Sequence, residues 1–313
     1  MKKTINRIIP ICILSGFAVL FLSCAGIAKA IGDSADDLGD SRAAGVLSRS
    51  AHSIGRALED ITPEQEYFIG RAVGANLLTN YQFCNERPEL TLYLNQITAA
   101  IVANSPKPEL YNGYHTAILD SDEINAFATS GGHIFIAVGL LNCASSEDTL
   151  AAVIAHEIAH IQLQHSLKAI KSNRVVSAII ETSTSVAGLV LSELTDVLDE
   201  AAKDIVTAMQ EGYSQEQEFD ADKLALELLA NAGYEPSSLL IMLRALKQNQ
   251  LTGNARRHPG GFSNTHPSPD ERIAKLERPL RQYERKAPDS VQDTQTYRKA
   301  RFEAATAKYG VPH

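Results

Sequence analysis

The sequence predicts an α+β domain that is mostly helical and contains one small β-sheet. Two observations predict this class. Apolar residues recur at three- and four-residue spacing in several segments between residues 62 and 249, as in helices with one buried face. Three short segments between residues 115 and 138 are rich in β-branched and aromatic residues, which is typical of strands. With 313 residues, 44% of them hydrophobic, the chain is long enough to bury a core.

The charge balance argues against a nucleic-acid-binding protein. The chain has 29 Lys and Arg residues against 37 Asp and Glu residues, a formal net charge of -8. Binding to a phosphate backbone needs a basic surface that releases counterions. We therefore expect no nucleic-acid partner.

Residues 1–30 are expected to form a secretory signal peptide. Lys2 and Lys3 precede an apolar run over residues 8–23, which Pro10 interrupts. The run is short for a permanent membrane span, and a retained anchor is the alternative.

Two cleavage patterns follow this apolar run. The A-x-A site at residues 28–30 fits an ordinary signal peptidase, whereas L-S-C at residues 22–24 resembles a bacterial lipobox in which Cys24 carries the lipid. Phe21 departs from the usual lipobox, so both alternatives stay open. Either signal predicts a protein of the bacterial cell envelope that lies in the periplasm, anchored to a membrane if Cys24 is lipidated.

The rest of the chain divides into three parts. We expect residues 31–60 to form a tether, because they are rich in Ala, Ser, Gly and Asp and have sparse apolar spacing. The folded domain is expected to span residues 61–280. Residues 281–313 are expected to form a C-terminal extension with one short helix near residues 297–307.

The first helix of the domain is predicted from its start. In the segment T-P-E-Q, Thr62 can cap the helix, Pro63 suits the first helical position, and Gln65 completes a capping box. A second helix is predicted over residues 88–103.

Strands are predicted next, at residues 115–120, 124–129 and 133–138. Gly131 and Gly132 separate the last two strands, and paired glycines are typical of a tight hairpin turn. The second and third strands are therefore expected to lie side by side.

Longer helices are predicted downstream. The S-x-x-D pattern that begins at Ser145 is a capping box, and a helix-prone stretch continues from it to about residue 198. Another helix is predicted over residues 214–232, ended by Gly233, and a further one over residues 236–249.

Two other segments have less regular patterns. Residues 251–269 are predicted to be a loop. Residues 175–198 are apolar but contain acidic residues, which argues against a membrane span. This segment either packs over the domain or acts as a lid or membrane-contacting element.

An H-E-x-x-H pattern at residues 156–160 lies inside a predicted helix. Residues four apart share one helical face, so His156 and His160 can bind one metal ion, with Glu157 beside them. His165 is five positions beyond His160, about 140° further around a continuous helix, and is expected to point away from the metal.

A catalytic zinc needs a third protein ligand and an open coordination position. Glu218 and Asp222 are also four apart on a predicted helix. One carboxylate can bind the metal, and the other can accept the remaining N–H of a histidine ligand and orient it. Without the upstream histidines, a solvated acidic helix face would be the preferred interpretation.

These motifs resemble those of the HtpX-like and CAAX-prenyl-protease-like zinc metallopeptidases. The resemblance covers about residues 62–275 and rests on N-A-F-A-T-S-G-G-H-I-F-I, the H-E-x-x-H helix, E-x-x-A-D from Glu218, and T-H-P-S-P-D-E-R-I from Thr265. It implies a zincin-like metallopeptidase domain of the envelope branch, with one Zn2+ per chain and the small sheet bordering the cleft.

The resemblance also implies roles for single residues. His156, His160 and Glu218 would bind zinc. Glu157 would be the general base, and Asp222 would orient a ligand. The residues that would border the cleft, where a peptide could add as a further strand, are Asn125, Ala126, Phe127, Gly131 and Gly132.

His266 and the pair Cys84 and Cys143 each allow more than one interpretation. His266 would lie near the zinc, as a catalytic residue or as a latch on the open position, or it is a loop histidine held by its neighbouring proline. Cys84 and Cys143 can pair in an oxidising compartment, or they are two buried free thiols.

The sequence thus predicts a zinc-dependent metalloendopeptidase of the cell envelope that acts on unfolded, misassembled or damaged envelope proteins. The activity follows from the residues, and the physiological role from the resemblance alone. The alternative is a chaperone-like or scaffolding lipoprotein with this fold and little turnover. Glu157 argues against it, because a binding protein needs no general base. Processing of lipidated peptides is disfavoured, since that task is associated with a multi-span membrane chamber.

Overall fold

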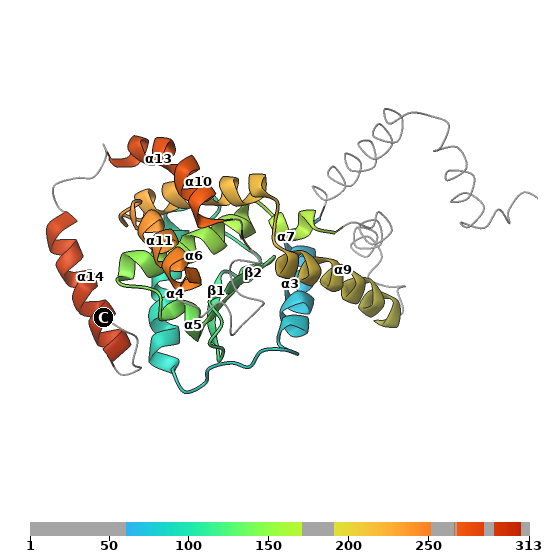
Figure 1. The fold of residues 1–313 in the computed structure, drawn as a ribbon. Helices are drawn as coiled ribbons and strands as arrows, with labels where there is room; N and C mark the ends of the chain where they lie inside the picture. Colours follow the sequence, from blue (N-terminus) through green and yellow to red (C-terminus); the bar gives the residue numbers. More distant parts are fainter. Residues whose placement is uncertain (1–60, 171–190, 252–265, 267, 285–290, 308–313) are drawn as a thin grey trace, which may run out of the picture. The chain divides into compact units, whose positions relative to one another are not determined.

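The computed structural model describes residues 61–170, 191–251, 266, 268–284 and 291–307. The predicted signal peptide with Cys24, the tether, and residues 175–190 of the apolar segment lie outside the described residues. Figure 1 shows the elements, which in chain order are α3 (Pro63–Leu77), α4 (Pro88–Ala103), β1 (His115–Leu119), β2 (Ala126–Thr129), β3 (His133–Ala137), α5 (Val138–Leu141), α6 (Glu147–Gln162), α7 (His165–Lys168), α9 (Leu191–Glu211), α10 (Gln215–Asn231), α11 (Ser238–Leu251), α13 (Pro269–Glu284) and α14 (Val291–Thr306). This order confirms the predicted class, a mostly helical domain with one small sheet.

The sheet is mixed, with β3 between β1 and β2. β1 runs parallel to β3, and β2 runs antiparallel to it, with Ala126 opposite Ile136. The predicted hairpin is confirmed: Gly131 and Gly132 form its turn with φ angles of 76° and 96°, which glycine adopts most readily.

Helices cover both faces of this sheet, because side chains alternate along each strand. On β3, Ile134 and Ile136 join a core with α4, α6, α10 and α11, while Phe135 joins a second core with α3 and α9. All three of these side chains are at most 5% exposed. The short strands are therefore apolar on both faces, which explains why they do not alternate between apolar and polar residues.

The start of α3 agrees with the predicted capping box. Thr62 Oγ1 accepts a hydrogen bond from the backbone N–H of Gln65 at 3.2 Å, and Gln65 Oε1 accepts one from the N–H of Thr62 at 2.8 Å. Two of the otherwise unpaired donors at this helix end are thus satisfied.

The helix α6 lies at the centre of the domain and packs against α4, α10, α11 and β2. The N-cap is Ser146, whose side chain accepts from the N–H of Thr149, so the predicted cap at Ser145 was wrong by one residue. Apolar side chains on several faces are fully buried, Ile154 and Ile158 among them. Because α6 is buried on all its faces, its polar side chains are surrounded by protein, and each needs a hydrogen-bond or ion-pair partner inside the domain.

The predicted helix-prone stretch beyond α6 is interrupted. α6 ends at Gln162, and Gln164 takes a left-handed conformation with φ 56° before α7 begins at His165. The turn redirects the chain, so helical periodicity cannot be extended from His160 to His165.

Two helices near the C-terminus complete the domain. α13 was not predicted as a helix, and the predicted domain end at residue 280 lies within it. α14 packs against α4 and α6, where Arg298 and Arg301 form ion pairs with Asp148 at 3.1 Å and Glu147 at 3.4 Å. These pairs join the C-terminal segment to the first turn of α6.

No helix within the described part of the chain is both long enough and apolar enough to span a membrane.

Candidate metal centre

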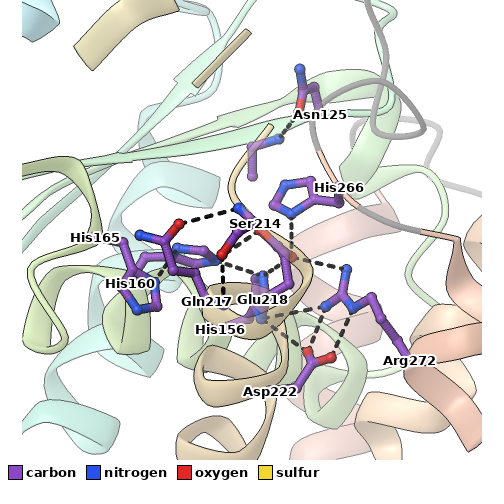
Figure 2. Close-up of polar contacts among 11 residues, drawn as sticks. Asn125, His156, His160, His165, Ser214, Gln217, Glu218, Asp222, His266 and Arg272 are labelled. Carbon is purple, nitrogen blue, oxygen red and sulfur yellow. Dashed lines mark hydrogen bonds and ion pairs between the residues drawn. The ribbon is translucent and has the colours of Figure 1, made fainter. Parts of the chain in front are cut away.

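Four polar side chains from three segments meet at the packing contact between α6 and α10. His156 and His160 come from α6, Glu218 from α10, and His266 from the residues before α13. One ligand atom of each lies within 4.8 Å of the others, and all four side chains are buried. Figure 2 shows them pointing toward one another. The structure therefore brings together the residues that the sequence predicted as metal ligands, with His266 beside them.

The two imidazoles of α6 converge as their spacing predicts. Their Nε2 atoms are 3.0 Å apart, and each lies 3.5 Å from a carboxylate oxygen of Glu218. Burial holds the pKa of His160 well below its usual value. His156 is also buried, but Asp222 and Glu218 outweigh burial and the charge of Arg272 and raise its pKa to about 9. A metal ion that binds here must therefore displace a proton from His156.

Glu218 is placed by the start of α10. Ser214 caps this helix by accepting from the N–H of Gln217, so Glu218 lies in its first turn. Its carboxylate is fully buried, yet the electrostatic interaction with His266 and the hydrogen bonds from His156 and His266 outweigh the effect of burial and hold its pKa well below the usual range. Glu218 is thus ionised, as a metal ligand must be.

Asp222 lies one turn further along α10 and contacts His156. Its Oδ1 is 3.1 Å from His156 Nδ1, so the carboxylate accepts this N–H and leaves Nε2 directed at the other ligands. Arg272 of α13 donates to both oxygens of Asp222, from Nε at 2.8 Å and from Nη2 at 2.5 Å. Burial acts to raise the pKa of Asp222, and Arg272 together with His156 lowers it overall.

Arg272 is a site residue that the sequence interpretation missed. Its side chain is 4% exposed, and Nη1 lies 3.6 Å from Glu218 Oε2. Two buried carboxylates on one helix face need a buried cation. Arg272 also lies in the T-H-P-S-P-D-E-R-I motif and shares a helix face with the buried Leu276 and Leu280, whereas Arg278 on the same helix is exposed. These signals could have found it.

His165 does not point away from the site, and that prediction was wrong. Its Nδ1 lies 3.0 Å from Nδ1 of His160. The left-handed turn at Gln164 brings the ring back to α6, and burial lowers the pKa of His165 to about 4. A neutral His165 can hydrogen-bond His160 Nδ1 and fix the ring orientation of that ligand.

Glu157 lies next to the ligands on α6 and is 3% exposed. Burial raises the pKa of its carboxyl above the usual value. Together with Val153 and His156, it lines a small cavity that Met242 and Leu243 of α11 close from the other side. A buried carboxyl group with raised basicity next to metal-ligating histidines suits proton transfer.

The residues predicted to border the cleft lie in and around the β2–β3 hairpin. Asn125, Ala126 and Phe127 are at most 4% exposed. Gly131 and Gly132 are enclosed: a Cβ on Gly131 would lie 2.5 Å from Tyr67 Cα, and one on Gly132 would lie 2.1 Å from the carbonyl oxygen of Gly113. Among the described residues, β2 pairs only with β3, so its other edge has no partner strand.

Cys84 and Cys143 are free thiols in the structure. The Cys143 thiol donates to the carbonyl oxygen of Gly139 at 3.4 Å, and burial raises its pKa to about 11. Of the two alternatives, the structure agrees with free thiols that behave as small apolar side chains.

The donor set fits zinc. Two imidazole nitrogens and one carboxylate are the ligands of a catalytic zinc with an open position. Glu218 Oε1 is buried and accepts no hydrogen bond from the described residues. A bound cation would satisfy this oxygen, which is otherwise costly to bury. The fold and this centre define a zincin-type metallopeptidase.

The family follows from comparison with known proteins. The model of Peptidase family M48 matches residues 88–280, which is more than half of the chain. The chain belongs to this family.

Curated relatives agree with this assignment. The beta-barrel assembly-enhancing protease of Escherichia coli K12 is 28% identical over 79% of this chain and 48% of the relative. The mitochondrial metalloendopeptidase OMA1 of Schizosaccharomyces pombe is 31% identical over 65% of this chain and 58% of the relative. The metalloprotease LoiP of Escherichia coli K12 is 30% identical over 37% of this chain and 45% of the relative. The chain spans about half the length of the curated relatives it matches.

Proposed function

We propose that this protein is a zinc-dependent metalloendopeptidase of the bacterial cell envelope that hydrolyses misfolded or damaged envelope proteins. The observation that carries the proposal is the convergence of His156, His160 and Glu218, with Glu157 on the same helix. The predicted signal peptide supports the compartment. The names of the Escherichia coli relatives, a beta-barrel assembly-enhancing protease and a metalloprotease, support protein substrates.

The geometry supports a task for each of these residues in peptide hydrolysis. A zinc ion held by the two α6 histidines and Glu218 would polarise the scissile carbonyl and acidify the attacking water. Glu157 accepts the proton of that water and then delivers it to the leaving amine, a task that its raised pKa favours. Asp222 and His165 keep His156 and His160 in the orientation that binds the metal.

Peptide substrates are proposed to bind at the edge of β2. This edge has no partner strand among the described residues, and β2 packs against α6, which carries the site. A peptide added here would be held through its backbone, so recognition would require an extended, unfolded segment more than a particular sequence. Asn125, Ala126, Phe127, Gly131 and Gly132 are all buried in this structure, so this contact would require the edge of β2 to become exposed when a peptide binds.

Cleavage of an unfolded model protein tests the proposal. We expect the purified protein to cleave reduced casein, to stop when a chelator removes zinc, and to resume when zinc is added back. The readout is the appearance of peptide fragments. Cleavage that survives the chelator would contradict a zinc mechanism. A folded, zinc-loaded protein that binds casein without cleaving it would favour the chaperone-like alternative.

We further propose that His266 acts as a latch on the open coordination position. It belongs to the group of four convergent ligands, and its Nδ1 is only 2.7 Å from Glu218 Oε2. His266→Ala is expected to increase kcat/KM severalfold with unchanged zinc content, since the fraction of open protein limits substrate binding.

The control for this variant is His115→Ala, which removes an exposed histidine from β1. This control should leave kcat/KM unchanged. A loss of activity in His266→Ala would instead assign His266 to catalysis, and an unchanged kcat/KM would mean that it is a loop histidine without a role in the reaction.

A further inference from the structure

The ring of Tyr213 packs against the metal centre on the side of His160. It stacks on His160 with centroids 4.7 Å apart and an interplanar angle of 26°, and its centroid lies 5.9 Å from that of His165. Gly212 before it has φ 89°, which glycine adopts readily, and Ser214 after it caps α10, so Tyr213 lies in the turn that precedes this helix. The stacked ring places the phenol beside a proposed ligand.

The hydroxyl of Tyr213 is buried and makes no hydrogen bond with the described residues. This is unusual, because a buried tyrosine hydroxyl generally finds a partner, and leaving a buried donor unpaired costs about 1–3 kcal/mol. The buried tyrosines Tyr93 and Tyr234 follow the rule, because both donate to Glu147, at 2.9 Å and 3.2 Å.

The unpaired hydroxyl lies among the groups that perform the proposed reaction. A tyrosine hydroxyl carries its proton at neutral pH, and the carboxylates of Glu157 and Glu218 lie near enough to interact with it electrostatically. It nevertheless donates to neither carboxylate. A donor whose hydroxyl is buried, unpaired and near the general base is preorganised for a partner that arrives with the substrate.

We propose that the Tyr213 hydroxyl donates a hydrogen bond to the carbonyl oxygen of the scissile peptide bond. This inference rests on the proposed peptidase function. When the water oxygen bonds to the carbonyl carbon, the electron pair of the C=O π bond moves to the oxygen, which becomes an oxyanion. The hydrogen bond from Tyr213 strengthens as this charge develops, and Tyr213 keeps its proton because Glu157 takes the proton of the water. When the C–N bond breaks, the C=O bond reforms and Glu157 protonates the amine.

The test is Tyr213→Phe, which removes the hydroxyl and keeps the stacked ring. We expect kcat to fall by about 10²–10³-fold, as when one oxyanion donor is lost, with little change in KM or zinc content. The melting temperature should be unchanged or higher, because an unpaired buried hydroxyl is removed. Tyr111→Phe, which changes an exposed tyrosine whose hydroxyl donates to Glu64, is the control and should retain wild-type kcat.

A second measurement does not require turnover. A phosphinic peptide mimics the tetrahedral oxyanion, so its affinity for zinc-loaded Tyr213→Phe, measured by calorimetry, should fall at least about tenfold relative to wild type. If wild type cleaves casein and Tyr213→Phe equals it in kcat and in phosphinic-peptide affinity, the inference about Tyr213 fails and the proposed function stands. Wild-type protein that neither cleaves casein nor binds the phosphinic peptide would overturn both.

Discussion

Replacing Glu157 with glutamine is expected to reduce kcat/KM by about 10²–10⁴-fold, the range that general acid–base catalysis contributes. Glutamine has nearly the same shape but cannot accept the proton of the attacking water. The three proposed ligands are unchanged, so the variant should retain its zinc. The measurements are casein cleavage and zinc content of the same sample.

The stability of this variant gives an independent readout. Burial raises the pKa of Glu157, so its ionised form at neutral pH is less favourable in the folded protein than in the unfolded chain. The melting temperature of Glu157→Gln at neutral pH should therefore equal or exceed that of wild type. Such an exchange of stability for activity is expected at a catalytic group.

Glu216→Gln is the matched control, because it makes the same change at an exposed position two residues before Glu218. It should retain wild-type activity. Wild-type cleavage rates in Glu157→Gln would show that Glu157 is not the general base.

Replacing Arg272 with methionine is expected to lower the free energy of unfolding of the zinc-free protein by about 3–5 kcal/mol, the cost of removing one partner of a buried ion pair. Arg272 holds both oxygens of Asp222 and also lies near Glu218. Without it, two fully buried carboxylates lack their cation. Denaturant unfolding in the presence of a chelator measures this loss.

Zinc should restore part of the stability lost in Arg272→Met, because the charge of the ion offsets that of the same carboxylates. The control is Arg278→Met, the same substitution at an exposed position of α13, which should change the unfolding free energy by less than about 0.5 kcal/mol. Equal unfolding curves for the two variants would mean that Arg272 does not stabilise the site.

Local patterns in the sequence determined much of this protein. The bounds of α4, the β2–β3 hairpin and the cap of α3 were predicted because turns and caps depend on neighbouring residues. The pairs His156/His160 and Glu218/Asp222 were predicted for the same reason, since a spacing of four places two side chains on one helical face. The sequence also indicated that these pairs share one metal, through the chemistry that zinc requires.

The tertiary structure alone decided which distant residues complete the centre. Tyr213 reaches it from a segment outside the recognised motifs, and Arg272 lies in the T-H-P-S-P-D-E-R-I motif, which predicts no task for it. A buried charge or ring finds its partners through packing between helices. His165 was placed wrongly because one left-handed residue, Gln164, ends the helical periodicity on which the prediction relied. Local periodicity extends only to the next break in a helix, and beyond that point the positions of side chains depend on how the elements pack.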